Sequence, residues 1–307
     1  MKKPKVIVIL GQTATGKSDL AVKIAQKVGG EVISADSRQV YKGLDLGTGK
    51  VPRDKIFPKS YNLKANTYLY KGIPHYLLDV ANAKNKFTVA DYKKLTDKKI
   101  EEILSRGKTP IICGGTGFYI YAVVNNTIFP EVPPNEKLRA SLNKKTAEEL
   151  FKILKKIDQR RAKNIDAKNK VRLIRAIEIA KKLGNVPKTK YQKPIYQFLK
   201  IGLYMPLELL KEKINKRLLS RIEDGMLKEI QNLHKNGLSW KRMEELGLEY
   251  RYVALYLQKK ITKEEMLERL NSEIFKYAKR QMTYFKRDPK IEWFNALNKE
   301  KIKALRI

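Results

Sequence analysis

The chain has 307 residues, of which 42% are hydrophobic, so it can bury a full core and form one α/β domain with an appended part. No stretch reaches about 18 uninterrupted apolar residues, the length that a membrane helix needs, and the N-terminus does not resemble a secretory signal. We therefore expect a cytoplasmic protein. Its single cysteine, Cys113, excludes an internal disulfide and a cysteine-based zinc site, and its apolar surroundings in the sequence predict burial.

The charge of the chain favours a polyanionic partner, with nucleic acid as the leading candidate. There are 66 basic and 32 acidic side chains, a net charge of +34. A lysine-rich genome explains part of this excess, because 50 of the basic residues are lysines and only 16 are arginines. The region between Lys137 and Lys190 holds 18 basic and 5 acidic residues, a local charge of +13, and five of the arginines: Arg139, Arg160, Arg161, Arg172 and Arg175. We predict that this region contacts nucleic acid.

The first motif is a phosphate-binding loop. An apolar run from Val6 to Leu10 leads into Gly11-Gln-Thr-Ala-Thr-Gly-Lys-Ser18, and the apolar spacing after it predicts a helix over 17–28. A strand, a glycine-rich turn and a helix N-terminus direct backbone N–H groups and the positive end of the helix dipole at one point, where phosphate oxygens bind. Lys17 adds a positive charge, and Ser18 offers a hydroxyl group to Mg²⁺.

A second predicted strand, over 31–35, ends in Asp36-Ser37-Arg38-Gln39-Val40-Tyr41. Its end lies at the sheet edge that carries the phosphate loop, where a carboxylate can accept a proton or orient an amine. The alternative role for Asp36 is a cap on a following helix, because a short polar side chain there satisfies free N–H groups. Ser37 can supply that cap, so we assign Asp36 to chemistry.

The remaining elements predict an α/β fold: a P-loop NTPase-like parallel sheet flanked by helices. A short strand or strand end over 76–80 is followed by a helix over 89–106, with Leu95, Ile100, Ile103 and Leu104 facing inward. A strand over 110–113 then leads into a second glycine-rich loop, Gly114-Gly115-Thr116-Gly117. A strand over 198–205 resumes the sheet, and helices over 207–235, 240–258 and 262–286 form a helical C-terminal segment.

The strand signal disappears between these two parts. Pro133-Pro134 marks a boundary, and helices are predicted over 137–143, 146–157 and 170–183. We therefore expect residues 130–192 to form a small all-α insertion that contacts RNA. Residues 1–129 and 193–307 would form the P-loop core domain.

Seven blocks, in the same order and across essentially the whole chain, resemble the tRNA dimethylallyltransferase (isopentenyl-tRNA transferase) family. They are Gly11-Gln-Thr-Ala-Thr-Gly-Lys-Ser18, Ser34-Ala-Asp-Ser-Arg-Gln-Val-Tyr41, Asp45-Leu-Gly-Thr48, Ile73-Pro-His-Tyr-Leu-Leu-Asp79, Gly114-Gly-Thr-Gly117, Arg172-Leu-Ile-Arg-Ala-Ile-Glu178 and Tyr277-Ala-Lys-Arg-Gln-Met-Thr-Tyr-Phe285.

This resemblance implies a Mg²⁺-dependent prenyltransferase that moves the dimethylallyl group of dimethylallyl diphosphate to N6 of adenosine 37 in tRNA. Its partners would be that diphosphate and the tRNA anticodon loop, without a membrane or an obligate protein partner, and a monomer is favoured. The implied catalytic residues are Asp36 as general base, Thr13 and Lys17, with Ser18 on the metal. The implied diphosphate site consists of Gly11, Gln12, Thr13, Ala14, Thr15, Gly16, Lys17, Ser18 and Arg217. The implied tRNA contacts are Asp36, Ser37, Arg38, Gln39, Thr116, Arg172, Arg175, Gly247, Arg251, Lys279, Arg280 and Gln281.

Two rival activities remain open at this stage. A small-molecule kinase would bind ATP or another nucleotide on the loop, close the insertion as a lid and use Asp79 for Mg²⁺. An adenylate isopentenyltransferase would prenylate free AMP and would not need the basic insertion. A non-catalytic RNA-binding protein would leave Lys17 and Asp36 without a role.

Two features depart from the family pattern. His75 is followed by Tyr76, where many family members have a second histidine. The segment over 51–72 is longer than expected, and we interpret it as a surface excursion.

Overall fold

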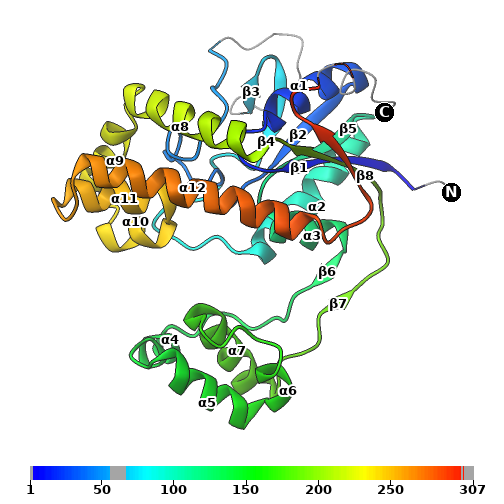
Figure 1. Cartoon of the computed structure of the whole chain (residues 1–307). Helices are drawn as coiled ribbons and strands as arrows, with labels where there is room; N and C mark the ends of the chain where they lie inside the picture. Colours follow the sequence, from blue (N-terminus) through cyan, green and yellow to red (C-terminus); the bar gives the residue numbers. More distant parts are fainter. Residues whose placement is uncertain (1–2, 56–66, 299, 301–307) are drawn as a thin grey trace. The chain divides into compact units, whose positions relative to one another are not determined.

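A seven-stranded sheet forms the centre of the larger of two compact units in the computed structural model, which describes residues 3–55, 67–298 and 300 (Figure 1). The strands lie in the order β3 (Tyr68–Tyr70), β4 (Ile73–Tyr76), β2 (Gly30–Ala35), β5 (Thr109–Gly114), β1 (Lys5–Gly11), β8 (Gln197–Tyr204) and β9 (Ile291–Asn295). Strands β3 and β4 pair antiparallel, and all other neighbours pair in parallel. This unit comprises residues 1–126 and 194–307.

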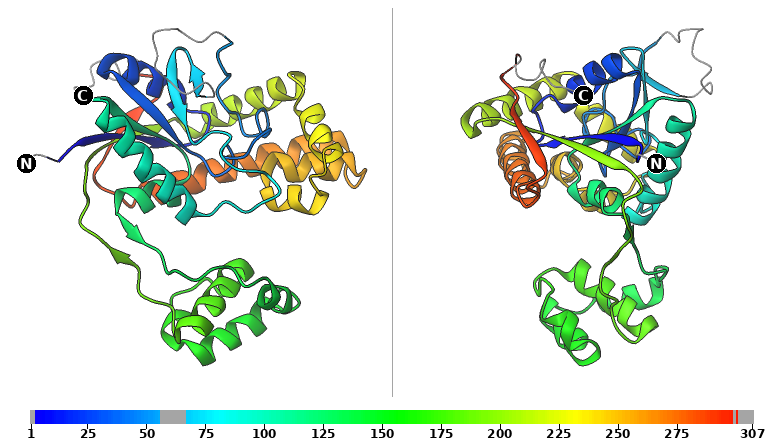
Figure 2. Two further views of the ribbon diagram at one scale, coloured as in Figure 1. Left: turned by 180° about the vertical axis from the view of Figure 1, so that it is seen from behind. Right: turned by 90° about the vertical axis from the view of Figure 1, so that its right-hand side faces the viewer.

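Helices cover both faces of this sheet, as Figures 1 and 2 show. Along β1, Val6 and Val8 belong to one hydrophobic cluster and Ile7 and Ile9 to another, and all four are fully buried. Helix α1 (Lys17–Val28) packs on the Ile7 face, whereas α2 (Val89–Ser105), α3 (Gly117–Val124) and α12 (Lys263–Phe285) pack on the Val6 face. Burial on both faces explains why the central strands read as unbroken apolar runs.

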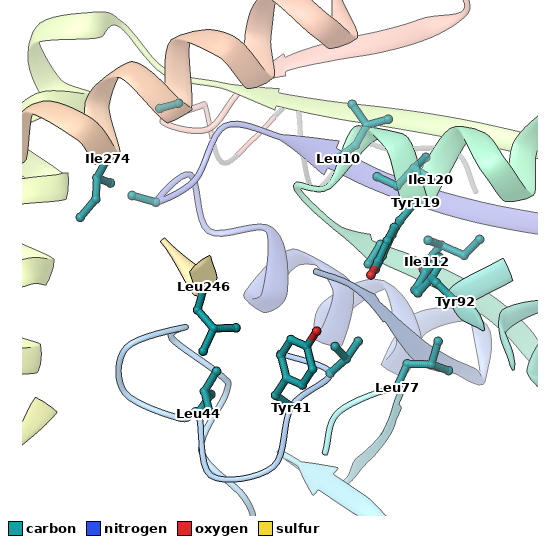
Figure 3. Packing of buried hydrophobic residues seen from close by; sticks show 14 of the residues in the cluster. Leu10, Tyr41, Leu44, Leu77, Tyr92, Ile112, Tyr119, Ile120, Leu246 and Ile274 are labelled. Atoms are coloured by element: carbon teal, nitrogen blue, oxygen red, sulfur yellow. The ribbon is translucent and has the colours of Figure 1, made fainter. Parts of the chain in front are cut away.

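The C-terminal helices share one core with the loop that follows β2. These helices are α8 (Leu207–Glu223), α9 (Met226–Lys235), α10 (Trp240–Leu246), α11 (Leu248–Leu257) and α12. Figure 3 shows Tyr41 and Leu44 of the loop in the same cluster as Leu246 of α10 and Ile274 of α12. This packing fixes the loop that carries the Asp36 motif.

Residues 127–193 form the second compact unit, which has its own core. It contains α4 (Glu136–Asn143), α5 (Ala147–Ile157), α6 (Gln159–Ala162) and α7 (Lys170–Leu183). Leu150 and Leu154 of α5 pack with Leu173 and Ile177 of α7, and all four are fully buried. Two short strands not expected from the sequence, β6 (Thr127–Ile128) and β7 (Lys190–Tyr191), pair antiparallel at the two ends of the unit.

The predicted fold class is confirmed, but several local predictions are wrong. Leu95 is 38% exposed, because the buried stripe of α2 runs through Tyr92, Thr96, Ile100 and Ile103 instead. The strand expected over 76–80 ends at Tyr76, since Leu77 and Asp79 take left-handed backbone conformations.

Two of the long C-terminal helices predicted from the sequence are each split in two by a glycine with positive φ. Gly225 (φ 102°) separates α8 from α9, and Gly247 (φ 77°) separates α10 from α11. Strand β9 and helix α3 were not predicted. Half of the 51–72 excursion, residues 56–66, lies outside the described residues.

Cys113 is buried at the end of β5, as predicted, and burial raises the pKa of its thiol to about 12. Within the part of the chain that the structure describes, no helix has the length and apolarity to cross a membrane.

Candidate active site

The loop between β1 and α1 has a backbone suited to an anion. Gly11 (φ 133°), Ala14 (φ 64°) and Gly16 (φ 86°) all have positive φ, and a Cβ atom on Gly11 would lie 2.1 Å from the carbonyl oxygen of Leu203. Only glycine therefore fits at position 11. At the start of α1, Gly16 provides no side-chain cap, so the first N–H groups of the helix remain open to a phosphate.

Two cations converge on this loop. Lys17 Nζ donates a 2.6 Å hydrogen bond to the carbonyl oxygen of Gln12, which also accepts from Thr15 Oγ1 at 2.8 Å. Arg217, which extends from α8, donates through Nη2 to Thr13 Oγ1 at 2.9 Å. Both cations are thus held at the turn where the diphosphate is expected.

Burial makes these two positive charges costly in the absence of an anion. It lowers the pKa of Lys17 to about 8, with a further contribution from Arg217. It also lowers the pKa of Arg217 to about 9, with a further contribution from Arg221. A bound anion would relieve both effects, so the site favours a multiply charged ligand.

Asp36 faces the same site, because its charge interacts with both Lys17 and Arg217. Its Oδ1 atom accepts hydrogen bonds from the backbone N–H groups of Arg38 (2.8 Å) and Gln39 (3.3 Å). Within the described parts of the chain, its Oδ2 atom has no hydrogen-bond partner. One oxygen therefore fixes the carboxylate, and the other can accept a proton.

The cap that we assigned to Ser37 is a wrong prediction. Residues 37–40 form a turn and not a helix, and Asp36 itself satisfies the N–H groups of that turn. Capping and chemistry are therefore compatible for one carboxylate. The backbone N–H group of Ser37 instead donates to Thr116 Oγ1 at 3.0 Å, across the gap to the second glycine-rich loop.

That second loop lies against the end of β2. A Cβ atom on Gly114 would lie 2.2 Å from the carbonyl oxygen of Ala35, and the N–H group of Thr116 donates to that same oxygen at 3.1 Å. The Asp36 turn and the Thr116 loop are thus rigidly paired.

The turn after Asp36 is also tied to the Asp45-Leu-Gly-Thr48 motif. Gln39 Nε2 donates to the carbonyl oxygens of Thr48 and Gly49, both at 3.3 Å. In turn, the carboxylate of Glu229 on α9 accepts the N–H groups of three successive residues of the motif: Asp45, Leu46 and Gly47. The hydrogen bonds of Gln39 therefore hold the Asp36 turn against this motif, which α9 fixes in turn.

Comparison with known proteins places the chain in a family. A family model described as IPP transferase matches residues 39–288, and a second model, described as isopentenyl transferase, matches residues 4–73. A protein named tRNA dimethylallyltransferase 2, from Treponema denticola, is 44% identical over 296 residues, which cover 94% of each chain. One named tRNA dimethylallyltransferase 1, from Syntrophus aciditrophicus, is 41% identical over 285 residues, covering 92% of this chain and 89% of its own.

Solved structures agree with the sequence matches. The full-length tRNA isopentenylpyrophosphate transferase from Bacillus halodurans superposes with a TM-score of 0.71 at 32% identity, covering 98% of this chain and 94% of that one. A eukaryotic dimethylallyltransferase described as acting on tRNA gives a TM-score of 0.75 at 26% identity, covering 97% of this chain and 75% of that one. The chain belongs to the tRNA dimethylallyltransferase family.

In this member of the family, the residues of α11 and α12 that were expected to contact tRNA differ in exposure. Arg251, Lys279 and Arg280 are exposed, and the Nε atom of Arg251 donates to the carbonyl oxygen of Glu244. Gly247 lies between α10 and α11. Gln281, in contrast, is 6% exposed, and both ends of its amide bond to the protein.

The two insertion arginines expected to bind tRNA in this transferase family also differ. Arg172 is exposed on α7. Arg175 is half-buried and forms a 2.5 Å ion pair with Glu178, and it also donates to the carbonyl oxygen of Val132. Arg139 pairs with the same buried carboxylate at 2.9 Å, and these partners lower the pKa of Glu178 to about 2 despite its burial. The described contacts of Arg175 are therefore those of a structural residue.

Sequence reasoning missed three residues of the site. Tyr277 on α12 is near Asp36, Thr116 and Gln281, and burial raises the pKa of its hydroxyl group. Arg221, one helical turn after Arg217, forms a 3.4 Å ion pair with the buried Glu249. The sequence did offer signals for two of them. Tyr277 is the first residue of the last of the seven family blocks, and the four-residue spacing puts Arg217 and Arg221 on one helix face.

The departure at Tyr76 has a structural explanation. Its hydroxyl group, on β4, donates at 2.8 Å to Glu31 Oε2 of the adjacent strand β2. His75 is buried and bonds through Nδ1 to the carbonyl oxygen of Ile73. Neither ring is among the residues that surround Asp36 and Lys17.

Proposed function

We propose that this chain transfers the dimethylallyl group from dimethylallyl diphosphate to N6 of adenosine 37 in tRNA and releases diphosphate. The observation that carries the proposal is that Lys17 and Arg217 meet at the phosphate loop and that the charge of Asp36 interacts with both of them. Two partly buried cations match a diphosphate leaving group, and a carboxylate with one oxygen that bonds to no described residue matches an amine that must lose a proton.

The geometry supports a direct displacement. An allylic C–O bond ionises readily, so the protein needs to stabilise the leaving group and to hold the nucleophile in line. In the proposed step, the N6–C1 bond forms while the C1–O bond breaks, and diphosphate leaves with its charge neutralised by Lys17 and Arg217. The proton from N6 passes to Oδ2 of Asp36.

Magnesium fits the phosphate loop as a partner of the diphosphate. The Ser18 side chain is exposed at the start of α1 and makes no hydrogen bond to any residue that the structure describes. Mg²⁺ prefers a few protein oxygens together with phosphate oxygens and water, and Ser18 can supply one of these. When bound, the ion would neutralise part of the diphosphate charge.

The proposal that tRNA is the acceptor rests on the names of the relatives and on the positive charge of exposed side chains. Adenosine 37 is stacked beside the anticodon, so it must be extruded at a cost of a few kcal/mol before its N6 can reach a pocket. Phosphate contacts from a basic surface offset that cost, and the exposed Arg251, Lys279 and Arg280 are suited to make them. We further propose that the protein acts as a cytoplasmic monomer.

The rival activities are less well supported. In a kinase, Asp79 would be needed for Mg²⁺, but its carboxylate forms a 2.5 Å ion pair with the buried Lys50. An adenylate isopentenyltransferase has no need of a tRNA-binding surface, whereas the relatives compared above are named for tRNA.

The test is a product assay with three acceptors. Purified protein is incubated with dimethylallyl diphosphate, Mg²⁺ and either tRNA, AMP or ATP with small acceptors, and the products are identified by mass. We expect a dimethylallyl adduct on adenosine 37 of tRNA only. Prenylated AMP, or phosphorylation without prenylation, would refute the proposal.

A further inference from the structure

The side chain of Gln281 joins the two glycine-rich loops of the site. Its Oε1 atom accepts a 2.7 Å hydrogen bond from the N–H group of Thr13, and its Nε2 atom donates at 3.0 Å to the carbonyl oxygen of Gly115. Thr13 follows β1, and Gly115 follows the neighbouring strand β5. One amide on α12 therefore bridges two loops that approach the substrates from adjacent strands.

This bridge is closely fitted. Gln281 is 6% exposed, and a Cβ atom on Gly115 would lie 2.1 Å from its Nε2 atom. The glycine at position 115 thus makes room for the amide. Because both polar ends of the side chain are used inside the protein, its contribution to RNA binding differs from that of the exposed Lys279 and Arg280 beside it.

Thr13 is consequently held from two helices. Gln281 of α12 fixes its backbone, and Arg217 of α8 fixes its hydroxyl group. Thr13 lies between Gln12, whose carbonyl oxygen accepts from Lys17, and Ala14, which has a positive φ. A shift at Thr13 would therefore move the anchor of the catalytic lysine.

We propose that Gln281 is a positioning residue for prenyl transfer, which fixes the phosphate loop relative to the Gly114–Thr116 loop and so couples α12 to the diphosphate. This inference rests on the proposed function and deepens it. The amide does not touch the reacting atoms. It sets the distance between the diphosphate loop and Asp36, whose turn is paired with Thr116, and a displacement of about 1 Å in such a site can cost a factor of about 10² in rate.

The experiment compares three variants with one matched control. Gln281→Leu removes both hydrogen bonds, Gln281→Glu keeps the acceptor for Thr13 but removes the donor to Gly115, and Gly115→Ala displaces the amide. The control is Gln258→Leu, because among the described residues the side chain of Gln258 bonds only to the carbonyl oxygen of Ala254, one turn earlier in α11. For each protein we would measure the melting temperature, the single-turnover rate on tRNA, and the affinities for inorganic pyrophosphate and for tRNA.

We expect the Gln281 variants and Gly115→Ala to react about 10 to 100 times more slowly and to bind pyrophosphate at least about three times more weakly. Their tRNA affinity should stay within about twofold and their melting temperature close to that of the wild type, and Gln258→Leu should match the wild type throughout. If Gln281→Leu does not fold, the other two variants carry the test.

Two results would overturn the inference. One is a folded Gln281→Glu protein whose rate and pyrophosphate affinity are those of the wild type. The other is loss of tRNA affinity alone, which would make Gln281 a direct RNA contact. Failure of the wild type to prenylate tRNA would instead refute the proposed function, and the pyrophosphate measurement would still test whether the loop depends on Gln281.

Discussion

Arg217 Nη2 and Thr13 Oγ1 form a 2.9 Å hydrogen bond that connects α8 to the phosphate loop across 204 positions of sequence. The guanidinium group can donate to this hydroxyl and still present further N–H groups to an anion, because it has five donors in a fixed arrangement. The bond therefore orients a cation that would otherwise be free to rotate.

Loss of Arg217 should lower the catalytic efficiency of the enzyme with its prenyl donor, dimethylallyl diphosphate. We expect Arg217→Ala to lower kcat/KM for dimethylallyl diphosphate by about 10². Thr13→Val should add less than about twofold in the Arg217→Ala background, because the two residues act as a unit. Steady-state kinetics of both single variants and the double variant measure this, with exposed Lys216→Ala as control. Fully additive effects would contradict the coupling.

Lys17 should give the donor site a pH dependence. Its pKa is lowered to about 8 in the free protein, chiefly by burial, so the fraction carrying the charge falls as the pH rises above 8. Because kcat/KM reports on the free enzyme, we expect kcat/KM for dimethylallyl diphosphate to be level below pH 8 and to fall towards tenfold per pH unit above it. Lys17→Ala should lower turnover by about 10² and remove this decline.

In Lys17→Arg the decline should begin at a higher pH, since a guanidinium group loses its proton at a higher pH than an ammonium group. Rate profiles from pH 6.5 to 9.5 for the three proteins would decide the matter. A profile of the wild type that stays level to pH 9.5 would show that Lys17 does not titrate in this way.

Asp36 should matter for chemistry more than for binding. Asp36→Asn keeps an oxygen that can accept from the N–H groups of Arg38 and Gln39, but it removes the base. We expect the single-turnover rate to fall by about 10² to 10⁴ while tRNA affinity changes much less. A rate within a few fold of the wild type would mean that the carboxylate serves only the turn.

The two arginines of α7 should respond differently to the same substitution. Arg172→Ala should weaken tRNA binding and reduce the salt slope of log K by up to about 1, because the side chain is exposed. Arg175→Ala should mainly destabilise residues 127–193 by about 1 to 3 kcal/mol, since it leaves the buried Glu178 with one cation fewer.

Titrations of tRNA at several KCl concentrations, together with urea unfolding, separate these two effects. Exposed Lys3→Ala is the control for general loss of charge. Equal and small effects on tRNA binding for Arg172→Ala and Lys3→Ala would mean that the charge of the insertion reflects composition alone.

Features that depend on local pattern could be predicted from the sequence. Strand β1, the phosphate loop and α1 follow one another within 24 residues, and each carries its own periodicity or glycine signal. The location of Asp36 followed from the rule that parallel strands end at one edge of the sheet. The helices of the insertion were found because their apolar residues repeat at helical spacing.

Features that depend on distant contacts could not be predicted in this way. Nothing near Gln281 indicates that its amide points inward to Thr13, and nothing near β9 indicates that Trp293 packs against Gly202. The pairing of Arg175 with Glu178 did have a local signal, an opposite charge three residues away on a helix, but the basic surroundings favoured an RNA contact.

The bridge between Thr13 and Gln281 also has a consequence for how the protein is made. A ribosome delivers Thr13 near the start of synthesis and Gln281 only 268 residues later, and β1 must wait for β8 before its second edge is paired. Contacts of such long sequence separation form slowly, whereas residues 127–193 can collapse on local contacts as soon as they emerge. The nascent chain can thus complete its helical insertion before its phosphate loop is finished, so chains that end before α12 lack the bridge that holds Thr13.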